Sequence, residues 1–171
     1  AAIAAIGMVD PVAVGLGAFG RHGGYVARQI ARWTTQYRAS ETRTIAAMDD
    51  LIDWLPANAP TAPEEVRLAH GDFRLDNLIL HPTEPRVLAV VDWELSTLGC
   101  PYADFAYNVM VWRIAPGVFR GLGGVDLSGT GIPTESEYID LWCRRTGRKR
   151  PENFNFYTIL ALFRIAAIIQ G

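Results

Sequence analysis

The 171 residues carry a formal net charge of −2, with acidic and basic side chains mixed along the chain, and 50% of them are hydrophobic. The length fits one domain, or one lobe of a larger one, with enough apolar residues to bury a core. The mixed charge argues against nucleic-acid binding. The longest apolar stretch, YTILALFRIAAII, is interrupted by Arg164 and is too short to span a membrane. Two distant cysteines, Cys100 and Cys143, fit buried thiols in a reducing compartment, so we expect a cytoplasmic protein.

The first residues, AAIAAIG, have the composition of a helix interior, and their abrupt start leads us to expect a piece of a longer protein. GLGAFG at residues 15–20 matches the G-x-G-x-x-G pattern of phosphate-binding loops. Its context argues against that function, because Pro11 limits a preceding strand and His22 stands where kinase loops have a valine. The chain's single lysine, Lys149, lies far downstream. We therefore predict that GLGAFG is a surface loop.

Two helices are predicted next. Residues 24–39 place Val26, Ile30, Trp33 and Tyr37 on one face at helical spacing. A second helix begins with Ser40 as its cap, has an apolar stripe that runs from Ile45 to Leu55, and is stopped by Pro56. The proline-rich segment NAPTAPEE then reads as a connector.

From residue 66 the pattern changes to short apolar runs, VRLAH, NLILH and VLAVVDW. HPTEPR, between the last two runs, is typical of the turn of a β-hairpin. The run LAVVD is apolar throughout, which predicts a strand that is covered on both sides. Helices are expected over about 103–113, 135–146 and 152–170. Between the first two, GVFRGLGGVDLSGTGIP is glycine-rich, and we expect it to be mobile.

The segment that carries chemistry is LAHGDFRLDNLIL, followed by Asp92 in VVDWE. Phosphoryl transfer needs an acceptor for the proton of the attacking hydroxyl and hard oxygen ligands for a divalent metal. Asp72 and, five residues later, Asn77 supply a carboxylate and an amide oxygen from one loop. The hairpin that begins at Asn77 ends near Asp92, so it can return a second carboxylate to the same place.

HGDFRLDN resembles the H-x-D-x-x-x-x-N catalytic loop of the aminoglycoside phosphotransferase and choline kinase superfamily, which is similar to protein kinases. The longer segment from residue 70 to YADFAY, and YVARQIARWTTQYRASET before it, resemble the phosphotransferase-like domain fused to some acyl-CoA dehydrogenases. The resemblance implies an α+β fold, the C-terminal lobe of a protein-kinase-like enzyme. That lobe would be mostly helical, with a small β-hairpin that carries the catalytic and metal-binding loops.

The resemblance also implies residue roles and cofactors. Asp72 would be the catalytic base or orient the hydroxyl, and His70 would brace the loop. Arg74 would face the transferred phosphoryl group of ATP, and Asp104 would support the loop backbone. Asn77 and Asp92 would bind Mg²⁺.

One departure from the superfamily is the absence of a phosphate-holding lysine ahead of the catalytic loop, since Lys149 follows it. We expect residues 1–171 to be the C-terminal catalytic and substrate lobe, with the N-terminal nucleotide lobe absent from this chain, and the isolated chain to have little activity. A homodimer, or fusion to an acyl-CoA dehydrogenase module, is the expected assembly.

The close relatives suggest a small-molecule acceptor, a hydroxyacyl compound or its coenzyme A thioester. Basic side chains outnumber acidic ones over residues 110–150, seven to four, which argues against a strongly cationic substrate. An aminoglycoside or another small molecule is the alternative substrate. A non-catalytic kinase-like binding lobe is the alternative from another class.

Several residues have two interpretations. Asp76 reads as a loop cap rather than a metal ligand, and Glu94 as a solvated or paired side chain rather than one that contacts a second metal or a substrate group. His22 and His81 read as surface residues. The tryptophans are expected in the core or in a cleft wall, and they are Trp33, Trp54, Trp93, Trp112 and Trp142. A basic cluster is either the cationic end of a helix or an attractor for an anionic substrate, and it comprises Arg144, Arg145, Arg148, Lys149 and Arg150.

Overall fold

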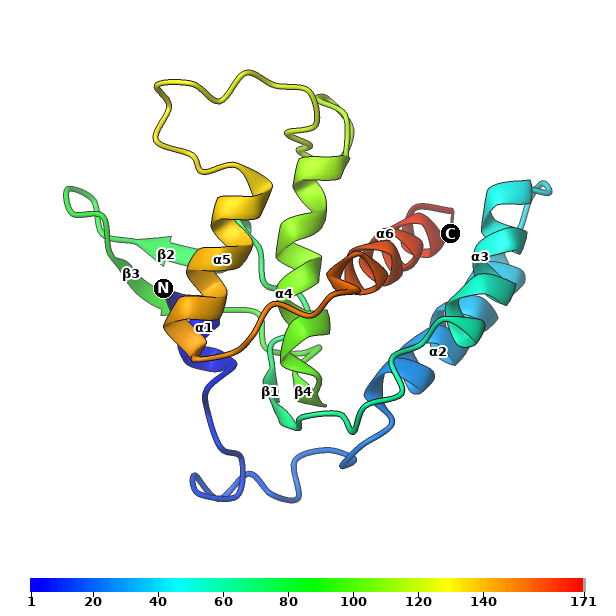
Figure 1. Cartoon of the computed structure of the whole chain (residues 1–171), viewed down its shortest axis with the longest axis horizontal. Helices are drawn as coiled ribbons and strands as arrows, with labels where there is room; N and C mark the ends of the chain where they lie inside the picture. Colours follow the sequence, from blue (N-terminus) through cyan, green and yellow to red (C-terminus); the bar gives the residue numbers. More distant parts are fainter. Residues whose placement is uncertain (171) are drawn as a thin grey trace.

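A computed structural model describes residues 1–170 as a mostly helical molecule with two small antiparallel sheets (Figure 1). The fold class expected from the sequence is confirmed. In chain order the elements are α1 (Ala2–Ile6), α2 (Tyr25–Ser40), α3 (Ala46–Ala57), β1 (Arg67–Ala69), the 3-10 turn η1 (Leu75–Asn77), β2 (Leu78–Leu80), β3 (Val87–Val90), β4 (Thr97–Gly99), α4 (Pro101–Val109), the 3-10 turn η2 (Met110–Arg113), α5 (Glu135–Thr146) and α6 (Phe154–Gln170). None of the described helices is long and apolar enough to cross a membrane.

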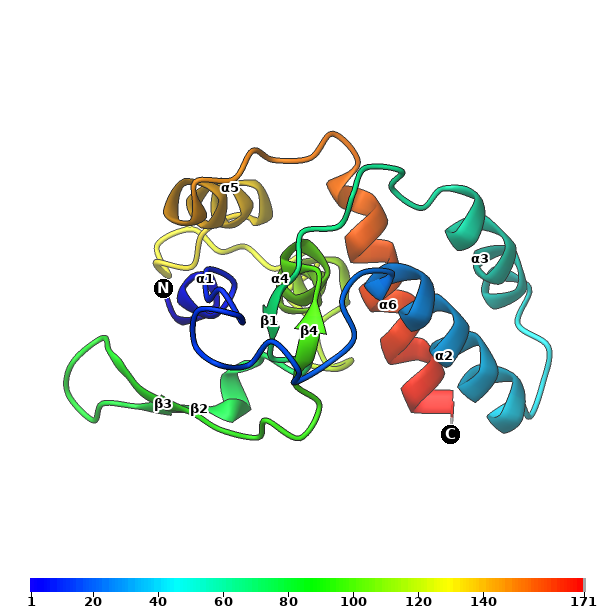
Figure 2. The ribbon, with the colours of Figure 1, turned by 90° about the horizontal axis from the view of Figure 1, so that it is seen from below.

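Helix α6 lies between α4 and the α2–α3 pair, while α1 and α5 cover the other side of α4 (Figure 2). The centre of the core is aromatic: the rings of Phe105 and Trp142 stack with centroids 4.5 Å apart. Tyr37 and Phe163 are fully buried in the same cluster. This core fixes α4 against the helices on both of its sides, and α4 in turn supports the loops described below.

The apolar stripe predicted for residues 24–39 is confirmed, since Val26, Ile30, Trp33 and Tyr37 are all buried. The prediction that Ser40 caps the next helix is wrong. Ser40 is the last residue of α2, and its hydroxyl donates to the carbonyl of Gln36 at 3.0 Å, so it completes the preceding turn. Helix α3 instead begins after an extended Ile45 and ends one residue beyond Pro56.

Helix α2 is capped from a distant part of the chain. Its own N-terminal residue, Gly24, offers no side chain for the free N–H groups of the first turn. The carboxylate of Glu64 accepts hydrogen bonds from the N–H groups of Tyr25 at 2.6 Å and Val26 at 2.8 Å. The connector that was expected only to join two parts of the chain therefore holds the start of α2.

The predicted hairpin is confirmed as β2 and β3, with Leu78 opposite Val90 and Ile79 opposite Ala89. The expectation that β3 is covered on both sides is wrong, because Leu88 is 49% exposed. The tip of the hairpin extends away from the helices, while Leu78 and Val90 at its base pack against the core (Figures 1 and 2). The run VRLAH forms β1, whose partner is β4, a three-residue strand that the sequence analysis missed.

GLGAFG is an exposed loop that no helix follows until Tyr25. Its last glycine has a packing reason: a Cβ atom on Gly20 would lie 2.6 Å from Oγ1 of Thr97 and 2.9 Å from the main-chain nitrogen of Leu98. The loop therefore crosses β4 too closely for any side chain. This close approach accounts for one glycine of the pattern without a bound phosphate.

Candidate active site

The loop between β1 and η1 contains Asp72 and places it at the surface of the core. Gly71, before it, has a φ of 82°, and a Cβ atom there would lie 2.4 Å from the carbonyl oxygen of Leu95. Only glycine satisfies both conditions. The sharp turn leaves the main chain of Asp72 largely buried and its side chain 12% exposed.

Asp104, in the first turn of α4, holds the backbone of this loop. Its carboxylate accepts hydrogen bonds from the N–H groups of His70 at 3.0 Å and Gly71 at 2.8 Å. Burial raises the pKa of Asp104, and the two N–H donors act in the opposite direction because they favour the charged form. The position agrees with the supporting role that the resemblance implies.

His70 connects the loop to the segment that follows β3. It is completely buried, its Nε2 lies 3.1 Å from the carbonyl oxygen of Val91, and its Nδ1 lies 3.2 Å from the N–H group of Asp72. The N–H group can only donate and the carbonyl can only accept, so the ring carries its proton on Nε2. The ring of Trp93 packs on the imidazole with centroids 4.6 Å apart. His70 therefore ties the backbone before Asp92 to the backbone of Asp72.

Asn77 is oriented by Asp72. Its side-chain amide donates to the carbonyl oxygen of Asp72 at 2.8 Å and to the carboxylate oxygen Oδ2 at 3.1 Å. With the amide nitrogen engaged in this way, Oδ1 of Asn77 is left as an oxygen ligand for a cation.

Asp92 is brought to the same end of the hairpin. The N–H group of Val91 donates to the carbonyl of Asn77 at 2.9 Å, so the chain reaches Asp92 directly beside Asn77. Asp92 is exposed and has a φ of 66°, a conformation in which Asp is found more often than other residues with a side chain.

The donor set fits a hard cation. One exposed carboxylate and one amide oxygen suit Mg²⁺, which is commonly held by one or two protein oxygens with phosphate oxygens and water as the other ligands. Among residues 1–170 there is no cluster of three His, Cys, Asp or Glu side chains that would make a self-sufficient metal site. Asn77 and Asp92 therefore fit a magnesium ion that is shared with a phosphate-bearing substrate.

Arg74 lies against the carboxylate of Asp72. Its Nε atom is 3.2 Å from Oδ2 of Asp72 and 3.8 Å from Oδ2 of Asp76, and its side chain is 40% exposed. The prediction that Asp76 caps the loop is wrong, since Asp76 pairs with Arg74 and with Arg120. Arg120 comes from the glycine-rich segment after η2, and nothing in its sequence context indicated this contact.

The remaining titratable candidates have local partners or none. Nε2 of exposed His22 lies 2.7 Å from the carbonyl oxygen of Gly17. Nδ1 of His81 accepts from the N–H groups of Thr83 at 3.3 Å and Glu84 at 3.0 Å, which stabilises the hairpin turn. Glu94 is exposed and makes no ion pair with any described residue. Both cysteines are buried as free thiols, and burial raises the pKa of Cys100 to about 11, so it is a poor nucleophile.

The tryptophans divide between the core and the surface. Trp33 and Trp142 are buried, and the indole nitrogen of half-buried Trp112 donates to the carbonyl of Pro133 at 3.1 Å. Trp54 and Trp93 are 38% and 37% exposed. Of these two, Trp93 borders the site through its packing on His70.

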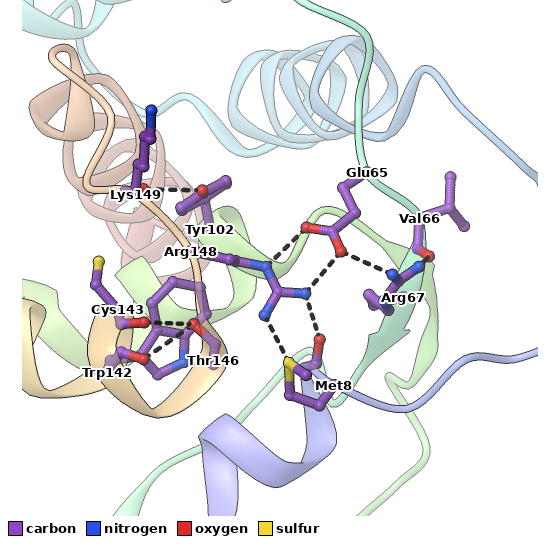
Figure 3. Close-up of polar contacts among 11 residues, drawn as sticks. Met8, Glu65, Val66, Arg67, Tyr102, Trp142, Cys143, Thr146, Arg148 and Lys149 are labelled. Atoms are coloured by element: carbon purple, nitrogen blue, oxygen red, sulfur yellow. Dashed lines mark hydrogen bonds and ion pairs between the residues drawn. The ribbon is translucent and has the colours of Figure 1, made fainter.

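Arg148, in the basic cluster at the end of α5, has a structural role. Arg148 donates to both carboxylate oxygens of Glu65, at 2.7 and 2.8 Å, and to the carbonyl of Gly7 at 2.7 Å (Figure 3). Its guanidinium also lies 5.4 Å from the ring of Trp142. The ion pair lowers the pKa of Glu65. Arg148 therefore joins α1, the connector and α5, a role that the sequence analysis did not predict.

Comparison with known proteins gives this site a context. A family model described as Phosphotransferase enzyme family (APH) matches residues 1–138. "Acyl-CoA dehydrogenase family member 10" of Mus musculus is 48% identical over 165 residues, which are 95% of this chain and 15% of the relative. "Acyl-CoA dehydrogenase family member 11" of Rattus norvegicus is 43% identical over 167 residues, 95% of this chain and 21% of the relative.

A solved structure shares the fold. It is a protein from Ralstonia eutropha, provisionally classed as an aminoglycoside phosphotransferase, with a TM-score of 0.95 and 55% sequence identity. The similarity covers 99% of this chain and 52% of the solved chain. The chain thus spans about half the length of that structure and about a fifth or less of the curated relatives.

Proposed function

Because this chain belongs to the phosphotransferase enzyme family, we propose that it is the C-terminal lobe of an enzyme that transfers the γ-phosphoryl group of ATP to a hydroxyl group of a small molecule. The observation that carries the proposal is that the backbone places Asp72, Asn77 and Asp92, three residues with side-chain oxygens, at one end of the β2–β3 hairpin. This arrangement supplies both a proton acceptor and a cation site for phosphoryl transfer.

Asp72 is proposed to accept the proton of the attacking hydroxyl. Asn77 and Arg74 both contact Oδ2, which fixes the plane of the carboxylate and leaves Oδ1 to face a substrate. His70 and Asp104 act as positioning residues, because they hold the loop backbone on both sides of Gly71. The hydroxyl is thus directed as its proton is removed.

Asn77 and Asp92 would hold Mg²⁺, which when bound offsets negative charge on the phosphate oxygens. Arg74 is half-exposed and adjoins the base, so its guanidinium is placed to contact the transferred phosphoryl group. Both assignments require ATP, which is the proposed cofactor together with Mg²⁺.

We further propose that a nucleotide-binding lobe precedes these residues in the complete protein. The superfamily holds ATP between two lobes, and the single lysine of this chain follows the catalytic loop. The chain covers 52% of the solved relative, a fraction that leaves room for such a lobe. Fusion to an acyl-CoA dehydrogenase module is supported by the names of the curated relatives, of which this chain is a small part.

The acceptor is proposed to be a hydroxyacyl compound or its coenzyme A thioester, which is consistent with relatives named for acyl-CoA dehydrogenases. An aminoglycoside is the second candidate, because the solved relative is provisionally classed with aminoglycoside phosphotransferases. A non-catalytic binding lobe would not require all three of Asp72, Asn77 and Asp92.

The test is ATP turnover by the full-length protein and its Asp72→Asn variant. Loss of a positioned base lowers kcat by about a hundredfold to ten-thousandfold, and nucleotide binding should persist. Asp50→Asn, on the exposed face of α3, is the matched control. Full turnover by Asp72→Asn would show that Asp72 is not the base, and no turnover by the wild type with any acceptor would favour the non-catalytic lobe.

A further inference from the structure

A cavity of about 470 Å³ opens beside the catalytic loop, between α2, the C-terminal half of α6 and the segment that follows Asp92. Three arginines line it, Arg28 and Arg32 from α2 and Arg164 from α6, together with the ring of Trp33. Gly71, the residue before the catalytic aspartate, forms part of its wall. We call this cavity the arginine pocket.

The arginines of the pocket lack acidic partners. Among residues 1–170, no carboxylate lies within ion-pair distance of Arg28, Arg32 or Arg164. Within the described part of the chain, Arg28 donates only to main-chain carbonyls, those of Gly23 and Arg21. Elsewhere in the structure, arginines form ion pairs with carboxylates, as Arg113 does with Glu135 and Arg148 with Glu65. Arg148 and Arg150 of the basic cluster at the end of α5 are likewise paired, with Glu65 and Asp140, whereas the three arginines of the pocket are not.

The side chain of Arg164 is oriented by two aromatic rings. Its guanidinium lies 4.5 Å from the ring of Tyr107 and 5.1 Å from the ring of Trp33, which fix its plane between two aromatic faces. Its Nε atom is buried and has no hydrogen-bond partner among the described residues. A buried donor without a partner is unfavourable, so an oxyanion that bound there would gain a hydrogen bond.

The pocket also lies next to the proposed catalytic residues. Glu94, two residues after Asp92, is its one acidic lining residue, so positive charges outnumber negative ones by three to one. The Tyr107 side chain that packs on Arg164 also lies near Asp72: burial raises the pKa of Tyr107 to about 12, and the Asp72 carboxylate contributes in the same direction. A ligand bound by the arginines would therefore extend toward the proposed base.

From this arrangement we infer that the arginine pocket binds an anionic group, a carboxylate or a phosphate, on the molecule whose hydroxyl receives the phosphoryl group. That the bound molecule is the phosphoryl acceptor rests on the proposed function. That the pocket binds an anion rests on the pocket alone. It selects among the candidate substrates, since a hydroxyacyl compound as its free acid or coenzyme A thioester carries such a group, whereas an aminoglycoside is a polycation.

Anion binding is tested first, without turnover. Inorganic pyrophosphate is titrated calorimetrically into the full-length protein without Mg²⁺, and into Arg32→Gln and Arg164→Gln. Loss of one charged contact should weaken binding about tenfold. Arg144→Gln, which removes an exposed arginine of α5, is the matched control and should bind as the wild type does. Arg32 is exposed, so its replacement should leave the fold intact even if Arg164→Gln does not.

The binding measurements show whether the arginine pocket is an anion site. No binding to the wild type, or equal binding by Arg32→Gln and Arg144→Gln, would overturn the inference. Loss of binding in Arg74→Gln but not in the pocket variants would do so as well, because it would place the pyrophosphate at the phosphoryl-transfer site.

Turnover then tests whether the anion belongs to the acceptor. We compare β-hydroxybutyrate, its methyl ester and β-hydroxybutyryl-CoA, and expect Arg32→Gln to raise KM about tenfold for an anionic acceptor while KM for ATP is unchanged. A rise with the free acid but not the ester identifies a carboxylate, and a rise with the thioester alone identifies its phosphates. A raised KM for ATP would overturn the assignment to the acceptor. If nothing is phosphorylated but the pyrophosphate difference remains, the proposed function fails and the anion site stands.

Discussion

The side-chain amide of Asn77 donates hydrogen bonds to both the carbonyl oxygen and the carboxylate of Asp72, at 2.8 and 3.1 Å. One residue therefore positions the proposed base while it presents its own Oδ1 to a cation. The geometry of proton transfer and that of metal binding are coupled through this side chain, so neither can change without the other.

Replacing Asn77 with Ala should reduce the affinity for magnesium–ATP by about tenfold or more and also lower kcat, because both the amide oxygen and the contact with Asp72 are lost. ATP binding by the full-length protein is measured as a function of Mg²⁺ concentration. Asn58→Ala is the matched control, since Asn58 donates to the carbonyl of Trp54 at the exposed end of α3. Unchanged Mg²⁺ dependence in Asn77→Ala would remove Asn77 from the metal site.

Gly71→Ala should destabilise the protein and abolish turnover, because φ is 82° and the new Cβ atom would meet the carbonyl of Leu95. Gly15→Ala separates the two causes: φ there is 77°, but nothing lies within 4 Å. The control should lose only about 1–2 kcal/mol in the free energy of unfolding and retain turnover. If urea unfolding showed that Gly71→Ala and Gly15→Ala lose the same free energy of unfolding, the protein would have relieved the contact between the new Cβ atom and Leu95.

Asp104→Asn should lower the free energy of unfolding by about 1–3 kcal/mol, because an amide cannot accept from both N–H groups as the carboxylate does. Burial raises the folded-state pKa of Asp104, so the folded state binds more protons there than the unfolded state. Stability of the wild type should therefore fall as pH rises from the ordinary Asp value to the raised one. Urea unfolding at several pH values should show this component in the wild type and not in Asp104→Asn.

Arg148→Met should destabilise the protein by about 2 kcal/mol, since it removes the hydrogen bonds to Glu65 and Gly7 that join three segments. Arg150→Met removes an exposed pair with Asp140 and should change stability by less than about 1 kcal/mol. Glu65 has a lowered folded-state pKa, so its contribution is present above the ordinary Glu value and is lost as pH falls through the lowered one. The measurement is thermal unfolding of both variants at neutral and acid pH. An equal loss of stability in Arg148→Met and Arg150→Met would contradict the prediction.

The parts of the fold that sequence could predict are those set by local pattern. The stripe of α2, the hairpin and the order of Asp72, Asn77 and Asp92 along the chain all follow from short spacings. The parts it missed depend on contacts between distant residues. Strand β4 is only three residues long and is defined by its pairing with β1, in which Leu68 lies opposite Leu98, 30 positions later in the chain.

The same limit applies to charge. The sequence shows how many arginines there are but not which ones face a carboxylate. Arg148 and Glu65 are 83 positions apart, so Arg148 looked available for an anionic ligand when it was not. Arg28, Arg32 and Arg164 were unremarkable helical residues until the fold placed them around one cavity.

The cap that Glu64 provides for α2 has a mechanical consequence. Glu64 stands six residues before His70 along the chain, and β1 lies between them. The start of the helix that carries Arg28 and Arg32 is thus anchored to the same short piece of backbone that leads to Asp72. If the α2–α3 pair shifts during a catalytic cycle, this tether makes the first turn of α2 the pivot. The far end of the pair would then move, while the distance between the pocket arginines and Asp72 would be kept.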